Sequence, residues 1–127
     1  MNAAGFAAVG IGAALGAWSR WGLALAFNHF VPALPLGTLI ANLSGGFLIG
    51  AAFELFVQHA TLPAEYRLFF VTGFLGSLTT FSAFSLEAVM LLQEARYGWA
   101  LMLISTHLLG SLAMTLLGFA VVRAFSG

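Results

Sequence analysis

Long apolar stretches, separated by short polar segments, run through the whole chain. Residues 1–19, 21–53, 68–86 and 97–122 contain no charged side chain. An α-helix rises about 1.5 Å per residue, so roughly 20 apolar residues cross a hydrocarbon core of about 30 Å. The stretches lack the alternation of polar and apolar residues that is typical of a half-buried strand. The pattern therefore predicts an all-α membrane protein.

Three short segments, residues 28–35, 59–65 and 94–98, have the composition of turns. The first two contain proline, which removes a backbone donor and disfavours helix at the residue before it. We therefore predict one transmembrane domain, 1–127, with four spanning helices near residues 3–27, 36–58, 66–94 and 98–124. The third helix is long for one straight span and contains the most polar stretch, so we expect a break inside it. Four spans would place both termini and the second turn on the same side of the membrane.

The composition narrows the class of protein further. Apolar residues make up 61% of the chain, charged residues only 6%, and cysteine is absent. A folded soluble surface needs far more charge than this. The formal net charge is zero, whereas a nucleic-acid binder needs a basic surface. We therefore expect neither a soluble enzyme nor a partner of nucleic acid, and no thiolate metal site.

The basic residues are divided evenly between the two ends of the predicted bundle. Arg67 and Arg123 belong to the end with the termini, whereas Arg96 and Arg20 belong to the other. An excess of Arg and Lys on one side normally sets the orientation in the membrane. Two interpretations stay open: the count is too small to carry meaning, or the chain inserts in both orientations, which would permit an antiparallel homodimer.

Small residues recur at four-residue spacing, as at Gly12 and Gly16 or at Gly46 and Gly50. Such pairs let helix backbones approach closely in lipid, so we interpret them as packing faces. Thr38 and Asn42 continue the second series on the same helix face. A polar group at membrane depth is expensive unless it is paired or faces water. Asn42 is therefore either a hydrogen bond between helices or part of a functional site.

The third helix contains a segment, residues 72–87, that does not resemble a lipid-facing helix. Two glycines weaken it, and hydroxyl groups crowd it: Ser77, Thr79, Thr80, Ser82 and Ser85. An interrupted helix frees backbone groups, which is tolerated only where protein or a cavity surrounds them. Freed carbonyls suit a hard cation such as Na⁺, and freed amides and hydroxyls suit an anion; a kink made for packing is the alternative.

Two aromatic residues follow directly, Phe81 and Phe84, spaced to share a helix face. An aromatic ring is positive at its edge, so rings turned edge-on to a pore could contact an anion; packing in the core is the alternative. On the fourth helix, His107, Ser111 and Thr115 form a polar stripe. No second histidine or carboxylate stands at the spacing of a transition-metal site. These residues together favour a narrow pore for a small anion over a cation pore, which would need an acidic ring.

The chain resembles the small double-barrelled fluoride channels, the Fluc family, along nearly its whole length. The matching pieces are residues 16–21 (GAWSRW), 37–43 (GTLIANL), 72–76 (TGFLG), 79–85 (TTFSAFS) and 110–115 (GSLAMT). The run of two threonines followed by two spaced phenylalanines is the most specific of them. Ser77 and Ala83 depart from the pattern of many members, which have Gly at the first position and Thr or Ser at the second.

The resemblance implies an antiparallel, dual-topology homodimer with two pores and a central structural Na⁺. It assigns the aromatic pair to Phe81 and Phe84, the pore amide to Asn42 and the pore serine to Ser111. It assigns the Na⁺ ligands to the backbone carbonyls of Gly76 and Thr79. The remaining pore residues that it implies are a polar track and its surroundings: Thr80, Ser82, Ser85, Glu87, Thr38, His107 and Arg20.

The expected function is passive export of cytoplasmic fluoride across the cell (inner) membrane by a multi-pass channel that is not an enzyme. One alternative is a small proton-coupled multidrug antiporter. Such an exporter needs a membrane-embedded carboxylate, whereas Glu54 and Glu87 lie near predicted helix ends. A second alternative is a non-conducting membrane subunit, which would explain the glycines but not the clustered hydroxyls.

Overall fold

The computed structural model describes residues 1–127 and contains helices but no strand. The elements are α1 (Ala3–Phe27), α2 (Leu36–Gln58), α3 (Ala64–Arg67), η1 (Leu68–Leu75), α4 (Gly76–Leu78), α5 (Phe81–Gln93) and α6 (Tyr97–Ser126). The all-α prediction is confirmed. The predicted ranges 3–27 and 36–58 coincide with α1 and α2, and α6 extends the predicted last helix by one residue at its start and two at its end.

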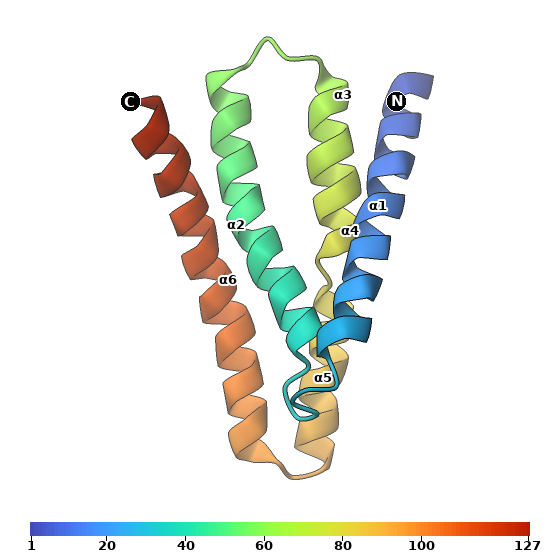
Figure 1. Ribbon diagram of the computed structural model, residues 1–127, viewed down its shortest axis with the longest axis vertical. Helices are drawn as coiled ribbons and strands as arrows, with labels where there is room; N and C mark the ends of the chain where they lie inside the picture. Colours follow the sequence, from blue (N-terminus) through green and yellow to red (C-terminus); the bar gives the residue numbers. More distant parts are fainter.

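Both termini lie at one end of the molecule, together with the turn between α2 and α3 (Figure 1). The turns between α1 and α2 and between α5 and α6 lie at the opposite end. The elements α3, η1, α4 and α5 follow one another along a single interrupted rod that joins the two ends. This arrangement is the one predicted from four antiparallel passes.

Three helical segments are long and apolar enough to cross a membrane: Leu36–Gln58, Ala64–Gln93 and Tyr97–Ser126. The first helix, α1, has 25 residues but falls outside this group. Over a window of membrane length, its mean hydropathy lies below that of the other three, and it contains Arg20. The prediction of four spans is therefore confirmed for three helices and stays a prediction for α1.

The expected break lies at Thr79 and Thr80. Both residues are extended, with φ −86° and ψ 153° at Thr79 and φ −148° and ψ 111° at Thr80. The next helix, α5, starts with a cap in which the Thr80 hydroxyl accepts a hydrogen bond of 3.1 Å from the Ala83 N–H. Before the break, Leu68–Leu75 form a π-helix, which the sequence pattern did not predict. Wide turns of this kind are rare and occur frequently at functional sites.

The small-residue series are packing faces, as interpreted from their spacing. A Cβ atom added to Gly12 would collide with the Phe69 carbonyl of η1, and one added to Gly16 would collide with the Phe74 carbonyl. Between α2 and α6, Gly50 faces the Thr115 carbonyl in the same way. Helix backbones thus touch directly, as small residues permit in membrane proteins.

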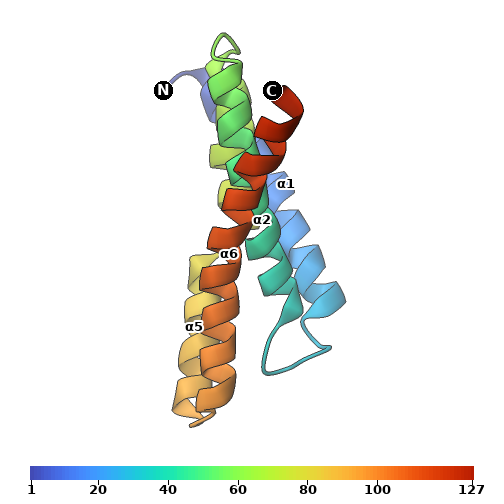
Figure 2. The same ribbon diagram turned by 90° about the vertical axis from the view of Figure 1, so that its left-hand side faces the viewer.

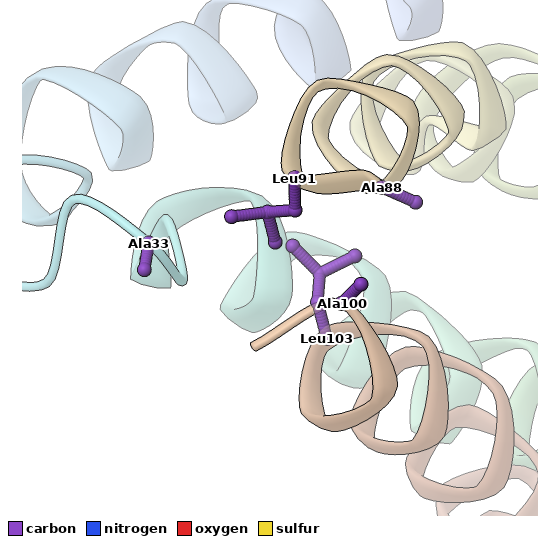
Figure 3. Close-up of a cluster of buried hydrophobic side chains, with 5 residues drawn as sticks. All are labelled: Ala33, Ala88, Leu91, Ala100 and Leu103. Atoms are coloured by element: carbon purple, nitrogen blue, oxygen red, sulfur yellow. The ribbon is translucent and has the colours of Figure 1, made fainter. Parts of the chain in front are cut away.

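Two apolar clusters pack against the interrupted third helix, one on each side of the break. The first joins the turn between α1 and α2 to the hairpin of α5 and α6, and consists of Ala33, Ala88, Leu91, Ala100 and Leu103 (Figure 3). The second packs Leu75 and Leu78, just before the break, against Ala41 of α2. From the break onward, α5 lies alongside the first half of α6 and away from α1 (Figure 2).

Candidate functional site

Asn42 of α2 lies opposite the break and pairs with both backbone groups of Thr80. Its side-chain Oδ1 accepts a hydrogen bond of 2.8 Å from the Thr80 N–H, and its Nδ2 donates one of 3.1 Å to the Thr80 carbonyl. A backbone N–H only donates and a carbonyl only accepts, so these two bonds determine which amide atom is oxygen. Asn42 therefore replaces, with one side chain, the helical hydrogen bonds that Thr80 loses at the break.

The same amide nitrogen lies 3.1 Å from Nδ1 of His107 on α6. Because an amide nitrogen only donates, Nδ1 must accept, and a neutral imidazole then carries its proton on Nε2. His107 is only 4% exposed, and its Nε2 has no hydrogen-bond partner in the chain. A buried donor without a partner is unfavourable by about 1–3 kcal/mol. His107 therefore keeps a buried Nε2–H group that has no acceptor in the chain.

A cavity of about 480 Å³ opens beside this hydrogen-bond network. It brings together most of the predicted pore and cation residues: Asn42, Gly76, Thr79, Thr80, Phe81, Phe84, His107 and Ser111. They come from α2, from the break region and from α6. No charged side chain lines the cavity. Its polar groups are hydroxyls, one amide, one imidazole and backbone atoms, which is a neutral lining.

The two phenylalanine rings meet edge to face at this cavity. Their centroids are 5.4 Å apart and their planes are inclined by 63°. The ring of Phe84 also lies against His107, with 5.0 Å between centroids. Phe81 is 79% exposed, so most of its ring is free to contact something outside the chain. The sharing of one helix face by Phe81 and Phe84, predicted from their spacing, is confirmed.

A second polar pair lies outside the cavity, between α2 and α5. The hydroxyl of Thr38, which is buried, donates a hydrogen bond of 2.8 Å to Oε2 of Glu87. The other carboxylate oxygen, Oε1, is buried without a hydrogen-bond partner. The structure therefore brings Thr38 and Glu87 together, one helical turn along α2 from Asn42, but apart from the aromatic pair.

The remaining predicted pore residues lie elsewhere. Ser82 and Ser85 are exposed and do not line the cavity, and the hydroxyl of Ser82 lies 3.2 Å from that of Thr80. Arg20 of α1 is half-buried, and its Nε donates a hydrogen bond of 3.0 Å to the Ser77 carbonyl. A role in conduction stays a prediction for each of these residues.

The break also leaves carbonyl groups without partners. The Ser77 carbonyl accepts from Arg20, but the carbonyls of Gly76 and Thr79 accept no hydrogen bond. Gly76 is exposed, and no group of three histidine or acidic side chains in the chain could hold a metal ion. Neutral carbonyl oxygens replace the hydration shell of alkali ions in channels. The donor chemistry of Gly76 and Thr79 thus fits a hard monovalent cation such as Na⁺.

Sequence reasoning named several residues that line one cavity but missed how they pair. The four-residue spacing of Thr38 and Asn42 shows only that they share a face of α2. Nothing in the spacing indicates that Glu87 lies opposite the first and His107 opposite the second. These two contacts join residues 49 and 65 positions apart, so only the packing of the helices creates them.

Comparison with known proteins gives consistent similarity over the whole chain. Residues 7–119 match the family model described as CrcB-like protein, Camphor Resistance (CrcB). The chain is 57% identical, over 91% of its own length and 91% of the relative's, to a Nitrosospira multiformis protein named fluoride-specific ion channel FluC. Proteins of the same name from Ralstonia pickettii and Pseudomonas putida are 56% identical (99% of this chain, 100% of the relative) and 52% identical (94% of each).

Proposed function

The chain belongs to the CrcB-like family, and on that premise we propose that it is a fluoride-specific ion channel through which cytoplasmic fluoride leaves the cell passively. It is a multi-pass membrane protein and not an enzyme. The observation that carries the proposal is the neutral cavity at the break, which the edge-to-face phenylalanines line together with Ser111 and His107.

The chemistry of fluoride matches this lining. Fluoride is small and strongly hydrated, and moving such a charge out of water is very unfavourable. A pore must replace the water shell with donors at close range, and yet bind weakly enough to release the ion. The hydroxyl of Ser111 and the ring edges of Phe81 and Phe84, residues that line the cavity, are donors of this kind. None carries a full positive charge that would trap the anion.

A second copy of the chain, inserted in the opposite orientation, completes the proposed channel. One chain leaves the cavity open, and the apolar Phe81, Leu108 and Leu112 that line it are 79%, 55% and 58% exposed. The even division of the four arginines supports insertion in both orientations. Two antiparallel copies would contain two equivalent cavities, and hence two pores.

In this arrangement α1 is the fourth spanning helix. Its 25 residues have a length of about 37 Å, which exceeds a hydrocarbon core of about 30 Å. It lies along η1 and α4, with glycines at the contacts. Its half-buried Arg20 has a backbone carbonyl as a partner rather than lipid. We assign the channel to the cell (inner) membrane, where a negative inside potential would drive fluoride outward.

A structural Na⁺ at the dimer interface is part of the proposal. The carbonyls of Gly76 and Thr79, two from each subunit, would hold it, since both are free of other partners. When bound, the ion would supply positive charge that offsets the converging carbonyl dipoles of the two breaks. The neighbouring Ser77 carbonyl already accepts a hydrogen bond from Arg20, so it is not among the proposed ligands.

The alternative of a proton-coupled antiporter has less support. Its exchange chemistry needs a carboxylate in the transport path, and no acidic residue lines the cavity. Glu54 pairs with Arg123 at 3.4 Å, and Glu87 pairs with Thr38. Neither carboxylate faces the aromatic pair.

The test uses purified protein in liposomes loaded with potassium fluoride or potassium chloride, with valinomycin added to balance charge and an electrode selective for the loaded anion outside. We expect rapid fluoride efflux that depends on valinomycin, does not need a proton gradient, and has no counterpart in liposomes loaded with chloride. Efflux that requires a proton gradient, equally fast chloride efflux, or no efflux would contradict the proposal.

A further inference from the structure

The position of Thr79 depends on the residue that faces it from α2. That residue is Gly45, which is buried three positions after Asn42. A Cβ atom built on Gly45 would collide with the Cγ2 methyl of Thr79, and the only other atom within 4 Å would be Cβ of the same threonine, at 3.6 Å. The neighbouring Gly46 instead faces Ser111 and Thr115 of α6. Gly45 is thus the glycine of α2 at which an added Cβ atom would meet only a residue of the break.

Hydrogen bonds prevent the Thr79 side chain from turning away. Its hydroxyl donates a bond of 2.8 Å to the Leu75 carbonyl, and its backbone N–H donates one of 3.1 Å to the same oxygen. With the hydroxyl held, the methyl group has to lie over Gly45. As long as this hydroxyl bond is kept, a methyl group added at residue 45 could be accommodated only if Thr79 moved as a whole, because a Cβ atom has no freedom of its own.

The next residue is held by the same helix. Both backbone groups of Thr80 bond to Asn42, so α2 holds two consecutive residues of the break, one by hydrogen bonds and one by van der Waals contact. A glycine inside a helix is less favourable than alanine. At residue 45 the helix contains glycine despite this lower helical stability, and alanine there would displace Thr79.

We propose that Gly45 is a positioning residue for the cation site: the space that it leaves for the Thr79 methyl holds the Thr79 carbonyl where it can bind Na⁺. This inference rests on the proposed structural Na⁺ at Gly76 and Thr79. It predicts that Gly45→Ala weakens sodium binding through the Thr79 methyl, so removing that methyl reduces the effect.

The experiment compares four purified proteins: the unaltered chain, Gly45→Ala, Thr79→Ser, and the double variant. For each, the melting temperature is measured in detergent while sodium is titrated against potassium at constant ionic strength. A ligand that binds only the folded state raises the melting temperature with its concentration, so the titration gives a midpoint for sodium without any transport assay.

We expect Gly45→Ala to raise the sodium midpoint by about tenfold when Thr79 is unaltered, a ratio typical of coupling between contacting residues. In the Thr79→Ser background the same change should raise it by less than about threefold, whatever Thr79→Ser does alone. Gly110→Ala is the matched control, because its Cβ would meet only the flexible end of Leu43, 2.7 Å away. It should leave the sodium midpoint unchanged.

The inference would be overturned if Gly45→Ala changed the sodium midpoint equally in the two backgrounds, or in neither. The channel proposal would still stand in that case if the unaltered chain conducts fluoride. No sodium effect on the unaltered chain would overturn both the cation site and the inference. If Gly45→Ala alone does not fold, Thr79→Ser is compared with the double variant. Equal sodium midpoints in those two would support the inference, and a double variant that does not fold or bind sodium would overturn it.

Discussion

The helix break and the interface between α2 and α6 contain similar residues, but the helix is interrupted only at the break. Both place a threonine against a glycine of α2. At the α2–α6 interface, the Thr115 hydroxyl donates to the Gly46 carbonyl at 2.9 Å and to the Ser111 carbonyl at 3.0 Å, and both helices stay continuous. At the break, Thr79 and Thr80 leave the helix, and the Asn42 side chain of α2 pairs with both backbone groups of Thr80.

The difference shows what makes a polar residue in a membrane helix functional. A hydroxyl that bonds to a carbonyl within its own helix or the adjacent one contributes to packing and has no free donor for an ion. At the break, Asn42 satisfies both groups of Thr80, and the carbonyls of Gly76 and Thr79 and the Nε2–H of His107 stay free. The unpaired polar groups, rather than the number of polar residues, distinguish the candidate site at the break from the packing interface between α2 and α6.

The largest effect is expected from Asn42→Ala. The change would leave both Thr80 backbone groups and the His107 Nδ1 without their partner, at about 1–3 kcal/mol for each group that stays buried. We expect the melting temperature to fall steeply and fluoride efflux from liposomes to fall by about 100-fold or more, since each 1.4 kcal/mol in a barrier changes a rate about tenfold.

Ser44→Ala on the same helix is the control for that change. The Ser44 hydroxyl bonds only to the Ala41 carbonyl of its own helix, at 3.2 Å. Its loss should leave both the melting temperature and the efflux nearly unchanged. Similar losses in Ser44→Ala and Asn42→Ala would mean that the pairing with Thr80 has no special weight.

Phe81→Ile should have the next largest effect on transport. Isoleucine keeps the apolar volume but has no positive ring edge. We expect fluoride efflux to slow by about 30-fold, with a melting temperature close to that of the unaltered protein, because a barrier increase of about 2 kcal/mol has this effect on rate.

The matched aromatic pair of the α2–α6 interface is the control. Phe53 and Phe119 also meet edge to face, with centroids 5.8 Å apart and planes inclined by 65°. Phe53→Ile should therefore leave efflux unchanged. Unchanged efflux in Phe81→Ile would remove the role proposed for the ring edges.

The smallest effect is expected from exchanging single hydroxyls for methyl groups in the two regions. Thr80→Val removes the cap of α5, which is worth about 1 kcal/mol, and one hydroxyl of the cavity. Thr115→Val removes a bond to a carbonyl that keeps its helical partner. We expect similar, small losses of melting temperature in both, but a several-fold slower efflux, about one kcal/mol in barrier, only in Thr80→Val. Equal efflux in the two variants would contradict the distinction between the candidate site at the break and the α2–α6 packing interface.

Much of the fold followed from the sequence. Charge-free stretches of membrane length predicted the helices, and proline-containing segments predicted two of the turns. Glycine spacing predicted the packing faces, and the clustered hydroxyls and glycines predicted the break. The π-helix before the break was missed, because residues 68–75 are mostly apolar and carry no local signal for a wider turn.

The site was predicted only as a set of residue types. Asn42, Phe81, Phe84, His107 and Ser111 were candidates, and they line one cavity. That Ser82 and Ser85 lie outside it, and that Arg20 bonds to the Ser77 carbonyl, could not be read from spacing. Both depend on where α5 and α1 lie relative to α2.

Local physics explains this division. Burial of apolar side chains in lipid and the conformational limits of proline act within a few residues, so the sequence alone determined the helices, their turns and a weak point in the third. The partner of each freed backbone group lies on another helix, tens of residues away. Only the packed structure decided that Asn42 would satisfy Thr80, that His107 would keep an N–H free, and that Gly45 would make room for Thr79.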